Sequence, residues 1–486
     1  MSFANDLLIG NPLRGNGWKK VFALTLVWMA TALLASAQTL TTLHSFTFGD
    51  GALPQFATPT QGRDGNAYAT TSVGGLSTTC GLGCGTTFKI TSQGALTSFS
   101  FDGTDGAISD AGLVLGRDGL FYGTTSSAGA SGNGDVFRLN PQTGALTVLH
   151  SFAGSDGASP EAPLTLGPGG KYYGTTYTGG ANNLGTVFSI TPSGTFTSLH
   201  SFSGADGQNP LGGGLTLGSD GALYGVTFFG GINGPGTIFK ITASGTFTKL
   251  YDFDQTHGAN PYGSLLLAAD GNMYGTTNAG GGLNQGTVFK LTPAGVLIVL
   301  HSFDVTDGGN PEGGLVQASD GKLYGTTFFG GGHGEGSIFY ITPGGTLTTV
   351  YSFPSFDGVD GANPFGLMQH TNGKFYGTTN QGGTSDNCSF FGSVGCGTVF
   401  SLDLGLGPFV KFVVPNGKVG SVIQILGTGL TGTTAVSFNG VPASSFKVVR
   451  DTFIKATVPP GATTGAVTVT TPTGTFTSNV NLTVLP

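Results

Sequence analysis

A tandem repeat of about 50 residues dominates the sequence. Its most regular part is the tetrad Tyr-Gly-Thr-Thr or a close variant, and successive tetrads begin 54, 51, 51, 50, 50 and 52 residues apart. The seven copies start at Tyr68, Tyr122, Tyr173, Tyr224, Tyr274, Tyr324 and Tyr376. A fixed period of this length is typical of folds in which each repeat forms one supersecondary unit. The chain is therefore expected to form either a closed ring or an open stack of similar units.

Each repeat predicts four short strands. In the fourth copy we expect strands at about 214–217, 223–228, 237–242 and 246–253. The pair Asp220-Gly221 between the first two strands suits a tight type I′ turn, and similar pairs recur in other copies. Gly accounts for 89 of 486 residues, which agrees with many short strands joined by turns. Four strands in about 50 residues are typical of one blade of a β-propeller.

The two ends of the repeat region predict how the ring closes. The seventh copy lacks the Thr-rich fourth strand that ends in Leu-His-Ser-Phe, and this phrase occurs instead at residues 40–46. A strand from residues 39–46 would complete the last sheet and leave no open sheet edge. The sequence thus predicts an all-β fold, with a seven-bladed β-propeller of four-stranded blades over residues 38–407. An open solenoid is the alternative, although no polar capping repeat is visible at either end.

The repeated phrases also resemble a known family. Gly-x-Leu-Tyr-Gly-Thr-Thr, Gly-Thr-Val-Phe-Lys and Leu-His-Ser-Phe are similar to the bacterial GloVer-type tandem repeat over about residues 39–405. Copy 1 departs from the pattern with Ala69 and copy 4 with Val226. This repeat is found in secreted and surface proteins, so the resemblance implies export and a propeller-like fold. It implies no particular activity.

The N-terminus has the features of an export signal. Lys19 and Lys20 precede an apolar run over residues 21–35, and Ala35-Ser36-Ala37 follows as a small-residue cleavage site. We therefore expect residues 1–37 to be a signal peptide and the protein to be secreted or at the cell surface. An uncleaved anchor is the alternative, but the run is shorter than the roughly 20 residues of a membrane span. No transmembrane segment is expected after cleavage, and a formal net charge of −7 argues against nucleic acid as a partner.

The composition changes after about residue 404 to a segment rich in Val, Thr and Pro. Short alternating runs at roughly 8–12-residue spacing predict a small immunoglobulin-like β-sandwich over residues 408–486. The phrases Gly-x-Val-Ile-x-Ile-x-Gly-x-Gly-Leu, Val-x-Phe-x-Gly-x-x-Ala and Val-Pro-Pro-Gly resemble an IPT/TIG domain. That resemblance implies a spacer or a binding module.

Four cysteines fall into two pairs in equivalent loops of copies 1 and 7. These are Cys80 with Cys84 and Cys388 with Cys396. Because export implies an oxidising compartment, we expect each pair to form a disulfide within its own loop. Pairing across the two copies and a shared zinc site are the alternatives.

The long loops predict which face of the propeller binds a ligand. The loop between the second and third strands and the loop that leads to the next repeat share one face, and both are variable. The residue after the tetrad is often aromatic or an amide there, which suits stacking on a sugar or peptide. The candidate binding residues are Tyr177, Phe228, Phe229, Asn278, Phe328, Phe329 and Asn380. Packing between blades is the alternative role for these side chains.

Acidic residues at two further repeat positions lie on the same predicted face. Asp110, Glu161 and Glu312 stand at the start of the first strand, where carboxylates from neighbouring blades could form a glycosidase pair. The Asp-Gly loops supply weak Ca²⁺ candidates, for which a turn cap is the alternative: Asp156, Asp206, Asp307 and Asp360. No cofactor other than Ca²⁺ is expected.

Three functions remain compatible with the sequence. No lipase-type nucleophile motif, zinc-protease motif or phosphate-binding loop is present. The leading hypothesis is a monomeric, non-catalytic binding or scaffold protein that recognises a glycan, peptide or protein. The alternative is a polysaccharide hydrolase or lyase with Asp110, Glu161 and Glu312 at the channel mouth, and a purely structural envelope component is the third possibility.

Overall fold

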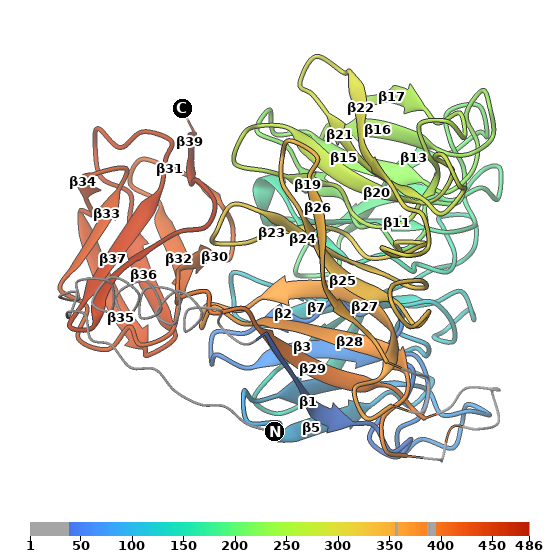
Figure 1. The fold of residues 1–486 in the computed structure, drawn as a ribbon, viewed down its shortest axis with the longest axis horizontal. Helices are drawn as coiled ribbons and strands as arrows, with labels where there is room; N and C mark the ends of the chain where they lie inside the picture. The colour runs from blue at the N-terminus through green and yellow to red at the C-terminus, as the bar shows by residue number, and fades with distance from the viewer. Residues whose placement is uncertain (1–37, 355–357, 386–387, 389–394, 486) are drawn as a thin grey trace, which may run out of the picture.

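The structure is a computed structural model that describes residues 38–354, 358–385, 388 and 395–485 (Figure 1). Its regular structure is almost entirely β-strand, with one short 3₁₀ turn, η1 (Pro168–Gly170). The expected all-β class is confirmed. The predicted signal peptide, residues 1–37, lies outside the described residues.

Each repeat forms its own antiparallel sheet, and we number the sheets 1 to 7 by the tetrad that they contain. Sheet 1 contains β2 (Thr60–Gln61), β3 (Ala67–Thr71), β4 (Thr86–Ile90) and β5 (Leu96–Ser100). Sheet 2 contains β6 (Val114–Leu115), β7 (Phe121–Thr125), β8 (Asp135–Leu139) and β9 (Leu146–Ser151). Sheet 3 contains β10 (Thr165–Leu166), β11 (Tyr172–Thr176), β12 (Thr186–Ile190) and β13 (Phe196–Ser201).

The remaining repeats follow the same order. Sheet 4 contains β14 (Thr216–Leu217), β15 (Leu223–Thr227), β16 (Thr237–Ile241) and β17 (Phe247–Asp252). Sheet 5 contains β18 (Ala259–Pro261), β19 (Leu266–Leu267), β20 (Met273–Ala279), β21 (Thr287–Leu291) and β22 (Leu297–Ser302). Sheet 6 contains β23 (Val316–Gln317), β24 (Leu323–Thr327), β25 (Ser337–Ile341) and β26 (Leu347–Ser352). Sheet 7 contains β27 (Ala362–Gln369), β28 (Phe375–Gln381), β29 (Thr398–Asp403) and β1 (Thr39–Ser45).

The N-terminal strand therefore completes sheet 7, as the sequence predicts for residues 39–46. β1 pairs antiparallel with β29, with Leu40 opposite Leu402 and Thr42 opposite Phe400. The strand that lies outermost in sheet 7 is thus more than 300 residues away in sequence from its partner. The pairing removes the open edge that β29 would otherwise present.

The first strand of most repeats is shorter than predicted. In the fourth copy only Thr216 and Leu217 pair as a strand, whereas the sequence predicts residues 214–217. The preceding glycines instead pack against the backbone of the neighbouring sheets. A Cβ on Gly214 would lie 2.6 Å from the carbonyl oxygen of Pro163, and one on Gly213 would lie 2.8 Å from that of Tyr262. The conformation of this segment is therefore determined by close packing between neighbouring sheets and not by hydrogen-bonded strand pairing.

An edge-to-face pair of phenylalanines joins each sheet to the next. The Phe that follows the outermost strand contacts the Phe of the next Gly-Thr-Val-Phe phrase, and the ring centroids are 5.1 to 5.5 Å apart. The seven pairs are Phe46–Phe88, Phe101–Phe137, Phe152–Phe188, Phe202–Phe239, Phe253–Phe289, Phe303–Phe339 and Phe353–Phe400. Since Phe46 follows β1, the first of these pairs links sheet 7 to sheet 1. This geometry is one of the favoured arrangements of aromatic pairs.

The tetrad residues have distinct structural roles. The tyrosine is buried in every copy except the fourth, where Tyr224 is partly buried, and in sheet 2 the Tyr122 hydroxyl donates to Asp118 Oδ2 at 2.7 Å. The glycine makes room for a ring, because a Cβ on Gly174 would lie 2.6 Å from Phe188 Cζ. The first threonine links neighbouring sheets, as when Thr326 Oγ1 donates to the Phe365 carbonyl oxygen at 2.9 Å. The repeated sequence thus reflects repeated contacts within and between sheets.

The C-terminal strands form a second lobe beside the repeat sheets (Figure 1). One sheet has the order β30 (Lys411–Phe412), β32 (Val422–Leu426), β36 (Phe453–Thr457) and β35 (Ser445–Arg450). The other has the order β34 (Val441–Pro442), β33 (Ala435–Phe438), β37 (Val467–Thr471) and β38 (Gly474–Thr477), while β31 (Asn416–Lys418) pairs in parallel with β39 (Thr483–Leu485). Side chains from both four-stranded sheets meet in one buried apolar cluster. The immunoglobulin-like and IPT/TIG assignments stay predictions.

Candidate functional site

The two sets of long loops lie side by side, as the sequence predicts. In sheet 4, Gln208 of the loop before the first strand bridges to Phe229 of the loop after the second strand, and in sheet 6 Gly309 bridges to Phe329. We call the surface formed by these two sets of loops the loop face. Each loop is positioned by backbone pairing that continues the sheet beyond its regular strands. The loop face is therefore attached to a rigid framework.

An asparagine links each of the later loops to the preceding sheet. Asn310 adopts a φ of 50°, in the left-handed region that Asn tolerates better than most residues. Its side-chain amide donates to the Asn278 carbonyl oxygen at 2.9 Å. All seven copies have a positive φ at this position, in the order Leu53, Ile108, Ser159, Asn209, Asn260, Asn310 and Asn363. The backbone conformation and the link between sheets together explain the recurring Asn-Pro in these loops.

Side chains that follow this turn meet in a cluster drawn from several sheets. We call the group Phe56, Asp110, Glu161, Tyr262, Glu312 and Phe365 the central cluster. The ring of Phe56 from the first copy lies 5.2 Å from Tyr262 of the fifth and 4.8 Å from Phe365 of the seventh. Burial raises the pKa of the Tyr262 hydroxyl, and the nearby carboxyl groups of Glu312, Glu161 and Asp110 raise it further. Sheets distant in sequence therefore converge at this point.

The three carboxyl groups of the central cluster have different environments. Asp110 is buried, and it accepts hydrogen bonds from Ser72 Oγ at 2.6 Å and Ser126 Oγ at 3.1 Å. Glu312 accepts one from Asn278 Nδ2 at 3.2 Å. Burial raises the pKa of Glu312 to about 7, and burial together with the nearby Asp110 raises the pKa of Glu161 to about 7. Two carboxyl groups therefore change charge near neutral pH, a property that is common at functional sites.

The predicted binding residues divide into buried and exposed sets. Asn278 contacts Glu312, and the Phe228 ring lies 5.7 Å from that of Tyr262, so both join the central cluster. Tyr177 and Phe328 are partly buried after their tetrads, and Asn380 is buried with no hydrogen-bond partner for Oδ1 among the described residues. Phe229 and Phe329 remain 38% and 45% exposed.

Further exposed apolar side chains lie in the loops of the same face. Leu76 and Ile232 are more than four-fifths exposed, and Leu283 is 63% exposed. All three belong to connections between the second and third strands of their sheets. Exposed apolar side chains gathered on one face are typical of an interaction surface.

Sequence reasoning missed the aromatic members of the central cluster. Phe56, Tyr262 and Phe365 occur directly after the turn, close to the repeat position that contains Asp110, Glu161 and Glu312. Their shared position was the available signal. An aromatic residue at this position is also compatible with ordinary core packing, so the sequence alone does not distinguish the two roles.

The four Ca²⁺ candidates are engaged in other contacts. Asp156 Oδ2 lies 2.9 Å from His150 Nε2, and Asp156 Oδ1 accepts the Ala153 backbone N–H at 2.8 Å. Asp206 and Asp307 pair in the same way with the histidines six residues before them, while Asp360 accepts the Tyr351 hydroxyl. Within the described ranges, no group of three His, Cys, Asp or Glu side chains could hold a metal ion. Asp156, Asp206 and Asp307 each cap their loop by accepting a backbone N–H.

The cysteines pair as predicted, each pair within its own loop. Cys80 is bonded to Cys84 in the connection between β3 and β4, and Cys388 to Cys396 in the connection between β28 and β29. Both loops belong to the loop face. The described part of the chain contains no helix with the length and apolar character of a membrane crossing.

The sequence matches the Gloeobacter/Verrucomicrobia repeat family over residues 31–218 and 193–391. The chain belongs to this repeat family. The two matched stretches together include all seven tetrads, so the family accounts for the repeat sheets and not for the C-terminal lobe. No curated protein matches the chain.

One solved structure supports the fold and nothing beyond it, and two others are similar over shorter parts of this chain. The extracellular domain of a candidate hybrid two-component system from Bacteroides thetaiotaomicron has a TM-score of 0.50 and 12% identity, with 89% of this chain and 52% of that one covered. A candidate 6-phosphogluconolactonase from Bacteroides fragilis has a TM-score of 0.44 and 17% identity, with 82% and 96% covered. A gluconolactonase from Xanthomonas campestris has a TM-score of 0.40 and 12% identity, with 77% and 92% covered. This chain spans about half of the first of these proteins.

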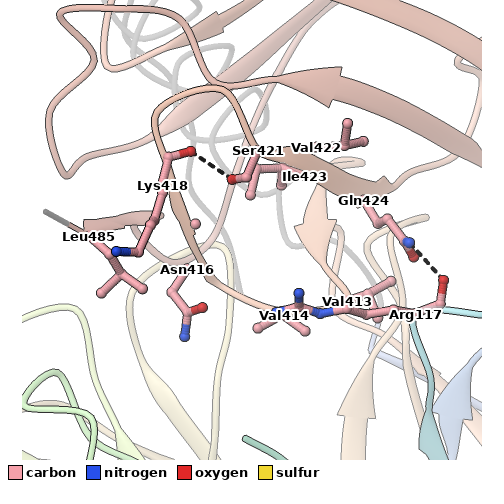
Figure 2. A pocket seen from close by; sticks show the side chains of 11 residues that line it. Arg117, Val413, Val414, Asn416, Lys418, Ser421, Val422, Ile423, Gln424 and Leu485 are labelled. Atoms are coloured by element: carbon pink, nitrogen blue, oxygen red, sulfur yellow. Dashed lines mark hydrogen bonds between the residues drawn. The ribbon is translucent and has the colours of Figure 1, made fainter. Parts of the chain in front are cut away.

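Two cavities lie at the junction between the repeat sheets and the C-terminal lobe. The first has a volume of about 190 Å³, and Figure 2 shows Arg117 of the repeat part beside Val413 and Gln424 in its lining. The Gln424 amide donates to the Arg117 carbonyl oxygen at 2.8 Å. The junction lies at the turns between first and second strands, since Arg63 in the β2–β3 turn donates to Gln424 Oε1 at 2.8 Å. It is therefore formed by a different set of connections from those of the loop face.

Proposed function

We propose that this chain is an exported, monomeric, seven-bladed β-propeller that binds a glycan, peptide or protein through its loop face. In this proposal residues 38–407 form the propeller and residues 408–486 an immunoglobulin-like, IPT/TIG-type spacer. Residues 1–37 serve as the export signal, and the two disulfides support an oxidising destination. The contact between Phe46 and Phe88, equivalent to the six others, supports closure of the ring.

One observation carries the binding proposal: exposed aromatic side chains lie on the loop face, and the ring of one of them, Phe229, contacts Phe228, which lies 5.7 Å from Tyr262 of the central cluster. Phe229 and Phe329 are exposed although each follows a buried strand. Aromatic side chains bury much area at small entropic cost and are enriched at binding surfaces. The central cluster adds carboxyl groups, two of which become negative above about pH 7, so a ligand with an apolar or flat surface and a hydrogen-bond-donating or cationic group is the best match.

Arrays of glycans and peptides test this proposal. The purified protein should be retained by a defined subset of probes, and Phe229→Ala or Phe329→Ala should reduce retention at least tenfold. Val296→Ala is the matched control, because Val296 is 55% exposed in a turn between the third and fourth strands. Equal retention of all three variants would contradict binding at the loop face.

A hydrolase or lyase acting on a polysaccharide is the second candidate function. The pKa values of Glu161 and Glu312, both raised to about 7, favour it because a general acid needs a pKa near the working pH. Glu161→Gln would then abolish product release from a bound polysaccharide while the retention of that polysaccharide persists. Product formation at the wild-type rate by Glu161→Gln would eliminate this candidate.

A further inference from the structure

The second junction cavity has a volume of about 280 Å³. One side of the cavity is lined by the repeat part, through the first strands of sheets 1, 2 and 7 and the residue before β10. The other side is lined by the C-terminal lobe, through β30 and the end of β32. The lining residues are Pro59, Thr60, Gln61, Leu113, Val114, Leu115, Leu164, Met368, Lys411, Phe412, Val413 and Leu426. Nine of these twelve side chains are apolar, so the cavity resembles a site for an apolar body more than a channel for water.

Lys411 is the only charged residue in this lining. Its ammonium group donates to the Gln369 carbonyl oxygen at 3.2 Å. No ion pair joins it to a carboxylate among the residues that the structure describes. An ammonium group has three hydrogens to donate, so two remain for a further partner.

The other polar side chains of the lining already form hydrogen bonds within the protein. Thr60 Oγ1 donates to the Leu113 carbonyl oxygen at 2.6 Å. The Gln61 amide donates to Thr371 Oγ1 at 2.8 Å and accepts the Thr371 backbone N–H at 3.1 Å. Lys411 is thus the lining side chain that can orient a polar ligand group.

Lys411 is partly buried, and removing an ammonium group from water without a counter-ion is costly. Burial lowers the pKa of Lys411 to about 7, and the same amine helps to lower the pKa of His370 to about 4. An anion seated on Lys411 would compensate the charge. The cavity therefore favours a ligand that carries a negative charge.

The surroundings of the cavity are cationic as well. The first cavity, which shares Val413 with the second, contains Arg117 and Lys418 in its lining (Figure 2). Neither lining includes Asp or Glu, although acidic residues outnumber basic ones by 25 to 18 in the whole chain. The charged residues of the two linings are therefore all basic, although the net charge of the protein is negative.

We propose that the Lys411 cavity binds a small amphipathic monocarboxylate. Its carboxylate pairs with the Lys411 ammonium group, and its hydrocarbon body packs among Leu113, Leu164 and the other apolar side chains. A phosphate dianion fits less well, because one amine would leave most of its oxygens without donors in an apolar cavity. This site is independent of the loop face and its ligand.

Calorimetric titration of the full protein with hexanoate tests the proposal. 1-Hexanol and hexylammonium serve as neutral and cationic probes of the same chain length. Lys411→Met removes the charge and keeps a flexible apolar side chain, and Lys374→Met is the matched control because Lys374 pairs with Asp403 at 3.2 Å on the surface.

Hexanoate should bind saturably and at least tenfold more tightly than either probe. Lys411→Met should weaken hexanoate binding at least tenfold, whereas Lys374→Met should change it less than twofold. The comparison of the three probes on the wild-type protein keeps the test valid if Lys411→Met fails to fold. Absence of saturable hexanoate binding, equal binding of 1-hexanol, or an unchanged affinity in a folded Lys411→Met variant would each overturn the proposal.

Discussion

The contact between Phe46 and Phe88 gives the sharpest test of how this chain closes on itself. Phe46 is fully buried, its ring lies 5.2 Å from Phe88, and its backbone N–H donates to the Gly397 carbonyl oxygen at 3.1 Å. Phe202 is the matched control within the continuous chain. It is also fully buried, its ring lies 5.4 Å from Phe239, and its N–H donates to the Gly185 carbonyl oxygen at 3.0 Å.

Because the two environments match, Phe46→Ala and Phe202→Ala should destabilise the repeat sheets by similar amounts. Truncation of a fully buried Phe to Ala typically costs about 3–5 kcal/mol from lost apolar burial and the remaining cavity. If residues 39–46 were attached only loosely, Phe46→Ala would cost far less than Phe202→Ala. The comparison therefore isolates closure from the general stability of the sheets.

Urea unfolding followed by tyrosine fluorescence measures both costs. All 13 tyrosines lie between residues 68 and 376, and both tryptophans lie within residues 1–37, so residues 38–486 report on the repeat sheets without tryptophan emission. Both variants should lower the unfolding midpoint to a similar degree with an unchanged slope. A cost below about 1 kcal/mol for Phe46→Ala, beside about 3 kcal/mol or more for Phe202→Ala, would refute the reasoning.

Three further predictions concern single positions, each measured by urea unfolding. Asn310→Gly should lower the free energy of unfolding by about 1 kcal/mol, because the hydrogen bond to the Asn278 carbonyl oxygen is lost. Asn310→Ala should lower it by about 1 kcal/mol more, because Ala tolerates a positive φ poorly. Equal losses in the two variants would contradict the role of the positive φ. Asp135 is buried, and burial raises its pKa against the smaller, opposite effects of Ser151 and His150. Asp135→Thr should therefore stabilise by about 1–3 kcal/mol at neutral pH and lose this gain as the pH falls below about 4, where the carboxyl is neutral in both states. A gain independent of pH would show that the charge is not the cause. Lys411→Met should stabilise the protein by a few kcal/mol at or below pH 7, where the Lys411 amine is charged in the unfolded chain and its charge is costly in the folded protein. This gain should vanish above about pH 10.5, where the amine is neutral in both states. A gain that does not change with pH would contradict the lowered pKa of Lys411.

Much of the fold follows from the sequence because the same local pattern occurs seven times. Asp-Gly turns, alternating strands and the displaced Leu-His-Ser-Phe phrase are local signals, and together they predict the sheets and the pairing of β1 with β29. The pairing of Cys80 with Cys84, and of Cys388 with Cys396, was predictable for the same reason, since each pair spans a short loop.

The length of the first strands was less predictable, because it depends on contacts between sheets. The sequence predicts that Gly214 begins a strand, but in the structure Gly213 and Gly214 approach the backbones of the two neighbouring repeats. Likewise, the recurring Asn-Pro reads as a turn signal alone. Its amide link to the preceding sheet becomes visible only when neighbouring sheets are placed.

The sequence by itself determined the repeat, its strands, the disulfide pairs and the strand that completes the last sheet, since hydrophobic alternation and turn residues act over a few positions. Tertiary structure alone decided which side chains meet. Phe56, Tyr262 and Phe365 come together from repeats about 100 to 300 residues apart, and Lys411 enters a cavity lined mainly by other sheets. The physical reason is that burial, and the pKa shifts it causes, depends on neighbours that no local pattern identifies.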